Sequence, residues 1–329
     1  MLGEEAAVRI IAELCQNHNG DPDLMRRMVD EAAAAGATHV KLQNIHASTV
    51  AFRPQFEDGL EVDGRTLAIR RPWAAERARL SGLELGDADV EEFVVRARGL
   101  GVVPMTTCFT RGEVDQVADQ GFEEVKVASY DCASFPLLRE LADRFDRMVV
   151  STGATFDDEV IHAASILRDR VELTLLHAVT IYPTPLSELH LARMDWLATL
   201  APSVGLSDHT LVARDGLVAA KAAIALGAQV VERHFTVLPP DETRDGPVSI
   251  DPGGLAEIVA FGRLEQSEQH ERLTAEGIDL ELLRGDAHRS LSDAELLNRD
   301  YYRGRFMTPR AHADQRATAM IANWEETPC

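Results

Sequence analysis

Eight short apolar runs, each followed by a helix-like segment, constrain the fold of this chain more than any other feature. Each run is too brief for a helix, and the runs cover residues 8–13, 38–43, 102–107, 125–129, 148–151, 173–177, 204–207 and 230–234. Helices are expected at residues 21–36, 87–100, 111–120, 135–145, 157–168, 189–200, 213–226 and 254–264. This regular alternation predicts an α/β fold, a (β/α)8 TIM barrel in preference to an open doubly wound sheet.

The chain of 329 residues is expected to form one catalytic domain with a short C-terminal appendage. Residues 1–265 hold the eight units, and residues 266–329 form a helical segment and a polar tail. Roughly 60 residues is short for an independent domain, so we expect the appendage to pack on the barrel or on a neighbouring subunit. The βα connection at residues 44–86 shows no periodicity, and a loop this long is usually functional. We interpret it as a lid or acceptor loop, with an oligomer contact as the alternative.

Charge and composition narrow the class of partner. The formal charge of −21 argues against nucleic acid or an anionic membrane as a partner. The N-terminus lacks the apolar segment of a signal peptide, and no stretch is apolar enough to span a membrane. The four cysteines have no CxxC grouping, so neither a disulfide framework nor a thiolate zinc site is expected. These observations predict a cytoplasmic protein with reduced thiols that acts on small molecules.

Two of the apolar runs end in a histidine beside a carboxylate. His209 follows Asp208 at the end of one run, and His234 lies two residues after Glu232 at the end of the next. In a barrel both imidazoles would project into the same mouth, where such barrels keep their chemistry. Two histidines and a nearby acid indicate a divalent metal site with open positions. The alternative is that each histidine simply caps its own strand.

Polar residues close the other strands as well. They are Glu13, Lys41, Gln43, Thr106, Thr107, Lys126, Ser129, Ser151, Thr152, His177 and Ser207. Lysines, hydroxyls and a Ser-Thr-Gly turn with outward-facing N–H groups are what a phosphate or phosphate-plus-carboxylate ligand requires. A single serine or threonine is more often a helix N-cap. Lys126 carries more weight, because an unpaired lysine inside a barrel is costly.

Several of these segments together resemble one enzyme family. Ile11-Ala12-Glu13, followed by Asn17-His18-Asn19-Gly20, resembles the opening motif of the sialic acid synthases, which include the N-acetylneuraminate, legionaminate and pseudaminate synthases. Further matches in the family's order lie at residues 40–43, 106–109, 125–129, 151–153, 176–177, 182–185, 205–210 and 232–236. The resemblance covers about residues 8–252, effectively the whole barrel.

The resemblance implies that phosphoenolpyruvate condenses with an open-chain aldose, such as an N-acetylmannosamine-like sugar. The products would be a 3-deoxy-2-ulosonic, sialic-acid-like acid and phosphate, and the cofactor would be Mn²⁺ or Mg²⁺. His209 and His234 would bind the metal, and the catalytic residues would be Glu13, Lys41, Lys126 and Glu232. The substrate-binding residues would be Gln43, Thr107, Ser129, Asp131, Ser151, Thr180, Tyr182, Ser207 and Asp245.

Two other functions stay open. One is condensation with an aldose phosphate, as in the octulosonate-phosphate and heptulosonate-phosphate synthases, which needs an extra basic cluster for the second phosphate. The other is a barrel without activity that serves as a binding or assembly subunit. The presence of Glu13, both lysines and both histidines argues against the second.

The resemblance stops before the C-terminal tail. The family's antifreeze-like domain, which sends an arginine into the partner's active site, has no counterpart in this sequence. Instead, residues 301–306 carry Arg303 and Arg305 between aromatic residues. We expect this segment to lie across a barrel mouth in a homodimer and to replace that arginine. In the alternative, the aromatic residues anchor the tail to the outside of the barrel and the arginines are solvated.

Overall fold

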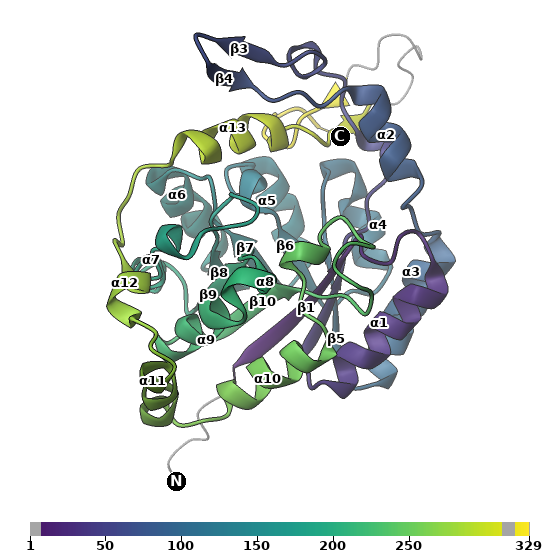
Figure 1. Cartoon of the computed structure of the whole chain (residues 1–329). Coiled ribbons are helices and arrows are strands. Elements are labelled where there is room, and N and C mark those ends of the chain that lie inside the picture. Colours follow the sequence, from purple (N-terminus) through teal and green to yellow (C-terminus); the bar gives the residue numbers. More distant parts are fainter. Residues whose placement is uncertain (1–7, 311–319, 329) are drawn as a thin grey trace.

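Eight parallel strands close into a barrel in the computed structural model, which describes residues 8–310 and 320–328 (Figure 1). The N-terminal residues before Val8, and Cys329, therefore lie outside the described residues. Around the barrel the strands are β1 (Arg9–Cys15), β2 (His39–Leu42), β5 (Val103–Thr107), β6 (Glu124–Val127), β7 (Arg147–Ser151), β8 (Glu172–His177), β9 (Ser203–Asp208) and β10 (Val230–His234). Each lies at a predicted apolar run, so the predicted TIM barrel is confirmed.

Helices follow the strands along the chain and cover the outside of the barrel. They are α1 (Pro22–Ala34), α3 (Asp87–Gly99), α4 (Val114–Asp119), α5 (Phe135–Ala142), α6 (Asp157–Leu167), α7 (Arg193–Leu197), α8 (Val212–Asp215), α9 (Val218–Ala225) and α10 (Pro252–Gly262).

Three of the predicted helices are shorter or broken in the structure. The segment 213–226 divides into α8 and α9 at Gly216, whose φ of 55° lies in the left-handed region that helices cannot use. The segment 189–200 keeps only α7, because His190 has a φ of 47° and stops a helix from starting earlier. The segment 111–120 begins as the 3₁₀ turn η3 (Arg111–Glu113) before α4.

Side chains fill the inside of the barrel in three successive layers, because residues two apart on a strand point the same way. The amino-terminal layer is polar, and in it the Arg9 guanidinium donates hydrogen bonds to Thr174 Oγ1 at 2.6 Å and Ser203 Oγ at 3.0 Å. The middle layer is a small apolar cluster of Ile11, Met105, Val149, Leu176 and Val230. The carboxyl-terminal layer is charged and faces the mouth of the barrel.

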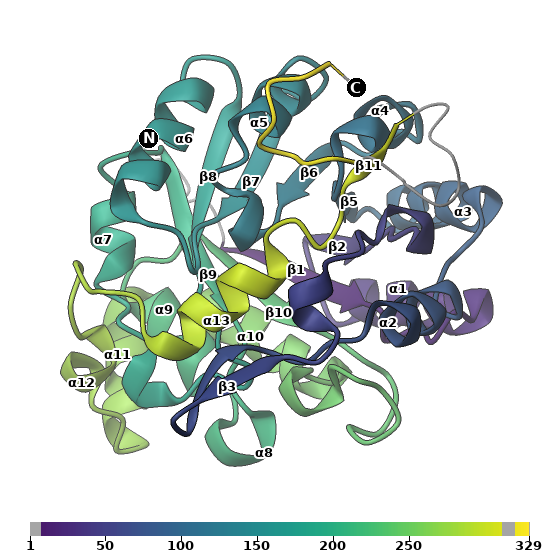
Figure 2. The ribbon, with the colours of Figure 1, turned by 90° about the horizontal axis from the view of Figure 1, so that it is seen from above.

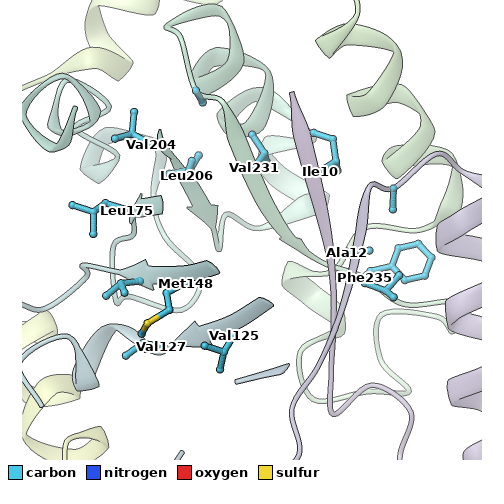
Figure 3. Packing of buried hydrophobic residues seen from close by; sticks show 14 of the residues in the cluster. Ile10, Ala12, Val125, Val127, Met148, Leu175, Val204, Leu206, Val231 and Phe235 are labelled. Carbon is cyan, nitrogen blue, oxygen red and sulfur yellow. The ribbon is translucent and has the colours of Figure 1, made fainter. Parts of the chain in front are cut away.

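The other face of each strand packs against the helices. These strand residues belong to the largest buried cluster, which also contains Met25 and Met28 of α1 and Phe93 of α3. Figure 3 labels members of the cluster on the strands or directly after them: Ile10, Ala12, Val125, Val127, Met148, Leu175, Val204, Leu206, Val231 and Phe235. The helix layer therefore fixes the strands from outside, and the inner residues at the carboxyl end remain available for a ligand.

The long connection after β2 has more structure than its sequence pattern indicated. Residues 44–86 contain the 3₁₀ turns η1 (Ala47–Thr49) and η2 (Pro54–Phe56), a hairpin of β3 (Leu60–Val62) and β4 (Arg65–Ala68), and helix α2 (Trp73–Ser81). The expectation of an irregular loop was wrong here, because these elements are too short to show a periodicity.

The appendage returns to the barrel instead of standing apart. It comprises α11 (Gln266–Ala275), α12 (Leu280–Arg284), α13 (Asp293–Tyr302) and the small pair β11 (Thr308–Pro309) with β12 (Met320–Ile321). Figure 2 shows α13 and the β3–β4 hairpin lying over one end of the barrel. None of the helices within residues 8–310 and 320–328 is long and apolar enough to cross a membrane.

The middle of β9 leaves no room for a side chain, which generates a stability prediction. A Cβ added at Gly205 would lie 1.8 Å from the Val230 carbonyl oxygen, a backbone atom of the neighbouring strand. We expect Gly205→Ala to destabilise the protein by about 3 kcal/mol or more, at or above the upper end for overpacking, as measured by urea unfolding. Gly99→Ala is the matched control, because its Cβ would meet nothing within 4 Å at the end of α3. Equal unfolding midpoints for the two variants would contradict this reading of the barrel.

Candidate functional site

A cavity of about 370 Å³ opens at the carboxyl-terminal mouth of the barrel. Every residue to which the family resemblance gives a catalytic, substrate-binding or metal-binding role lines it, except Asp131, whereas Thr106, Thr152 and His177 of the strand-end set do not. The lining includes Glu13, Lys41, Gln43, Thr107, Lys126, Ser129, Ser151, Thr180, Tyr182, Ser207, His209, Glu232, His234 and Asp245. These residues lie at or just beyond the ends of different strands, so closure of the barrel is what brings them together.

The first of two buried lysine–carboxylate pairs joins opposite sides of the barrel. Lys126 Nζ of β6 lies 2.5 Å from Glu232 Oε2 of β10, and both side chains are 4% exposed. Ser207 donates to the other carboxylate oxygen of Glu232 at 3.1 Å. Burial alone would raise the pKa of Glu232, but Lys126 and Lys41 hold that pKa far below its ordinary value. The interaction corrects the expectation of an unpaired Lys126.

The second pair lies beside the first. Lys41 forms an ion pair with Glu13 and donates a hydrogen bond to Thr107 Oγ1 at 3.1 Å. Burial lowers the pKa of Lys41 to about 7, against the opposing effect of the Glu232 carboxylate. The ion pair with Glu13 opposes this shift, and a bound anion would further favour the charged form of Lys41.

Hydroxyl groups on one side of the cavity are not all satisfied by the protein. Ser129 Oγ accepts a hydrogen bond from the backbone N–H of Gly153 at 3.2 Å. Within the described part of the chain, Ser151 Oγ and Thr180 Oγ1 are buried and have no hydrogen-bond partner. Since buried polar groups are almost always paired, these two hydroxyls are suited to hold a ligand oxygen.

The two histidines lie side by side at the mouth. Their ring centroids are 5.1 Å apart, and Tyr182 packs edge-on against His209 at 4.4 Å. Burial, with a contribution from His234, holds the pKa of His209 well below its ordinary value, and burial also lowers the pKa of His234. Both rings are therefore neutral, as metal ligation requires.

A buried ion pair on the outer face fixes these strand ends. Arg233 and Asp208 alternate with the inward-facing residues and meet at 2.5 Å with no exposure to solvent. Arg233 also donates to the hydroxyl and the carbonyl oxygen of Thr210. The carboxylate beside His209 in the sequence is thus a structural partner of Arg233 and faces away from the two imidazoles.

The structure adds Cys15 to the site, a residue that the sequence reasoning missed. Cys15 lines the cavity and its thiol donates to Asp245 Oδ2 at 2.7 Å. Cys15, His234 and Asp245 each offer one ligand atom, and these three atoms lie within 4.8 Å of one another. Burial and the Asp245 carboxylate raise the pKa of the thiol well above its ordinary value. A search for clustered cysteines could not find this group, because its members come from distant parts of the chain.

The structure also adds a basic cluster at the outer end of the cavity. Arg79 donates to both oxygens of Glu76 at 2.9 and 3.0 Å, Arg305 forms an ion pair with it, and Arg244 lies 3.8 Å away. Burial would raise the pKa of Glu76, but these arginines lower it to about 2. Together with Arg71, which also lines the cavity, the cluster carries four positive charges against one carboxylate.

The C-terminal tail covers the mouth of its own barrel. Asn298 donates to the Thr180 carbonyl oxygen and Arg299 to the Ala154 carbonyl oxygen, both at 2.6 Å. Arg305 lines the cavity, whereas Arg303 stacks on Trp324 at 5.0 Å. Arg305 therefore reaches the cavity of its own barrel, Arg303 is half-buried against Trp324, and the arrangement of the tail in a homodimer stays a prediction.

Asp131 lies outside the cavity lining. Its carboxylate accepts hydrogen bonds from Ser134 Oγ at 2.8 Å and from Asn323 Nδ2 of the tail at 3.0 Å. Burial raises the pKa of Asp131 to about 6, although both donors oppose the shift. Its neighbour Tyr130 takes the position at the cavity wall.

Comparison with known proteins identifies the family. Residues 28–271 match the NeuB family model. The chain is 31% identical over 258 residues to the N,N′-diacetyllegionaminic acid synthase of Campylobacter jejuni, covering 75% of this chain and 72% of that protein. It is 28% identical over 270 residues to the N-acetylneuraminate-9-phosphate synthase of Mus musculus, covering 78% and 69%.

A solved structure agrees with these sequence matches. The N-acetylneuraminic acid synthetase of Leptospira borgpetersenii, crystallised with citrate, is 25% identical and superposes with a TM-score of 0.65 over 82% of this chain and 92% of that chain. The chain therefore belongs to the NeuB family and is an enzyme of the sialic acid synthase type.

Proposed function

We propose that the enzyme condenses phosphoenolpyruvate with the open-chain form of an aldose, using a divalent metal, Mn²⁺ or Mg²⁺. The products are a 3-deoxy-2-ulosonic acid and inorganic phosphate. One observation carries the proposal: two buried lysines, two unsatisfied hydroxyls and two neutral histidines face a single cavity. The names of the synthases to which the chain is similar support the same reaction class.

The lysines and hydroxyls suit the anionic donor. Lys41 and Lys126 offset the charge of the phosphate and carboxylate groups, and hydrogen bonds to charged groups are worth about 1.5–3 kcal/mol each. Ser151 and Thr180 line the same cavity and offer hydroxyls that have no hydrogen-bond partner among the described residues. Because each lysine already pairs with a carboxylate, the donor binds by sharing lysines whose positions are set before it arrives.

The histidines suit a metal next to the donor. His209 and His234 are buried and neutral, and within residues 8–310 and 320–328 neither Nδ1 atom has a hydrogen-bond partner. A bound divalent ion would polarise the aldehyde oxygen of the aldose as a Lewis acid. Asp245 and Tyr182 line the same part of the cavity and would orient the sugar.

Glu13 suits the step that involves water. It is held in place by Lys41 and accepts a hydrogen bond from the Cys15 backbone N–H at 2.6 Å. Carbon 3 of the enol bonds to the aldehyde carbon, water adds to carbon 2, and the bond from carbon 2 to the phosphate oxygen breaks. Glu13 would orient that water and take one of its protons, which passes on to the new sugar hydroxyl. The other proton leaves with the phosphate as carbon 2 becomes a ketone.

The basic cluster favours a second candidate for the acceptor, an aldose that carries a phosphate. The outer end of the cavity presents Arg71, Arg79, Arg244 and Arg305 against the single carboxylate of Glu76. This surplus of positive charge is more than a neutral sugar needs and fits a second phosphate. It supplies the extra basic cluster that condensation with an aldose phosphate requires.

We also propose that the enzyme acts in the cytoplasm as a homodimer. The three described cysteines, Cys15, Cys108 and Cys132, are free buried thiols, which suits a reducing compartment.

The hairpin after β2 exposes Leu60, Val62 and Leu67, and such clustered apolar side chains mark contact surfaces. Light scattering against the chain mass of 36.1 kDa tests the assembly.

Phosphate release from phosphoenolpyruvate is expected to require both an aldose and a metal. A chelator should stop it reversibly, and His209→Ala or His234→Ala should abolish it while leaving the circular dichroism spectrum unchanged, because the two rings contribute little to the core. His162→Ala is the control, since this exposed histidine packs on Phe135, outside the cavity. Full turnover in a metal-free preparation, or in either site variant, would contradict the proposed metal.

The acceptor is tested with paired aldoses that differ only by a terminal phosphate. If the second candidate holds, the wild type prefers the phosphorylated sugar, and Arg244→Ala lowers kcat/KM for that sugar at least tenfold, about 1.4 kcal/mol. The kcat/KM of Arg244→Ala for the neutral sugar should equal that of the wild type. Arg77→Ala serves as the control, because this exposed arginine of α2 lies over Trp73 and outside the cavity lining. If the wild type prefers the neutral sugar and Arg244→Ala does not change that preference, the second candidate is excluded and an aldose without a phosphate remains as the acceptor.

A further inference from the structure

We propose that Cys15 is a metal ligand through its sulfur atom, together with His209, His234 and Asp245, and that the site therefore favours a transition metal over Mg²⁺. The inference rests on the proposed function in placing a metal beside the two histidines. It goes further by completing the ligand set, in which Asp245 binds the metal instead of the sugar, and by naming the class of ion.

The backbone presents Cys15 to the cavity in an unusual way. The pairing of β1 with β2 slips by one residue between Glu13 and Cys15, so a bulge interrupts the regular alternation of side chains there. Cys15 has a φ of 53°, a conformation that residues other than glycine rarely adopt. Bulges of this kind re-aim a side chain next to active sites. Here the bulge puts the Cys15 side chain into the mouth of the barrel, where it lines the cavity.

Three of the ligand atoms are spaced close to what one ion requires. The sulfur of Cys15, a ring nitrogen of His234 and a carboxylate oxygen of Asp245 all lie within 4.8 Å of one another. Bonds from a metal to nitrogen, oxygen and sulfur ligands are about 2.0–2.3 Å long, so atoms that share an ion lie up to roughly 4.5 Å apart. Small rotations of the side chains would bring this group onto a common centre.

The histidines supply an independent observation. His209 and His234 are 6% and 7% exposed, and in the described residues the Nδ1 atom of each is buried without a partner. Their ring centroids are 5.1 Å apart. Unpaired buried nitrogen atoms are rare and call for a ligand, and a metal held between the rings would satisfy them.

The type of ligand decides the type of ion. Mg²⁺ prefers oxygen ligands and several bound waters, whereas a thiolate and two imidazoles suit Zn²⁺, Fe²⁺ or Co²⁺. When the metal binds, the sulfur–hydrogen bond of Cys15 breaks, the sulfur–metal bond forms, and the proton passes to solvent. Without a metal the thiol keeps its proton and donates a hydrogen bond to Asp245.

Cobalt substitution tests the ligand directly, without any substrate. A Co²⁺–thiolate bond produces a charge-transfer absorption in the near ultraviolet that nitrogen and oxygen ligands do not. We expect this absorption when Co²⁺ is added to the metal-free wild-type enzyme. Cys15→Ser should abolish it and weaken Co²⁺ binding at least about tenfold, the loss produced even when only the groups behind a ligand are disturbed.

Two further variants keep the test decisive. Cys15→Gly removes the thiol and suits the positive φ, so it separates loss of the ligand from backbone strain. Cys132→Ala removes a buried thiol outside the cavity and should keep the absorption. Co²⁺ binding without the absorption, or with an absorption that survives in both Cys15 variants, would overturn the ligand assignment alone. Failure of the wild type to bind Co²⁺ at all would overturn the metal in the proposed function as well.

Discussion

The buried ion pair between Lys126 and Glu232 is the interaction on which the site depends. It spans the barrel from β6 to β10 with both side chains almost fully buried. Removing one partner of such a pair typically costs about 3–5 kcal/mol, because the other charge stays buried without compensation. The barrel therefore holds its charges in pairs, and Lys41 with Glu13 repeats the arrangement. An anionic substrate can bind here by taking the place of a carboxylate beside a lysine or by sharing the lysine with that carboxylate. A mouth lined by apolar residues would offer no positive charge to such a substrate.

The layered interior explains why the charges gather at one end. The apolar middle layer separates the polar layer around Arg9 from the charged layer at the mouth. On the outer face, the pair between Arg233 and Asp208 holds β10 to β9 at the point where the two histidines emerge. The strand ends thus supply the inner part of the site, and loops and the tail supply its outer part. Because α13 and the β3–β4 hairpin cover the mouth (Figure 2), the outer cavity is built by the same chain.

The sequence predicted the barrel and most of the inner site because both follow from strand periodicity. Residues at strand ends share one mouth once the barrel closes, so Glu13, Lys41, Lys126 and the two histidines could be placed together. The bulge at Cys15 was hidden, since nothing in the local pattern marks a residue with positive φ that is not glycine. Arg79 and Arg244 come from connections without periodicity, and only the folded chain brings them to Glu76. Asp131 was placed in the site by the family resemblance alone, but its carboxylate is held by Asn323 from the far end of the chain.

Binding of phosphoenolpyruvate to the resting enzyme tests the central claim most directly. The chain has only three lysines, and the third, Lys221, pairs with Glu257 on the outside of the barrel, so Lys221→Met is a matched control for Lys126→Met. By titration calorimetry we expect Lys126→Met to weaken binding by about 1.5–3 kcal/mol, roughly ten- to a hundredfold, through the lost charge-assisted contact. The unpaired Glu232 would add repulsion to that loss. Lys221→Met should bind like the wild type. Unchanged affinity in Lys126→Met, or an equal loss in both variants, would contradict a donor site built on the paired charges of the barrel mouth.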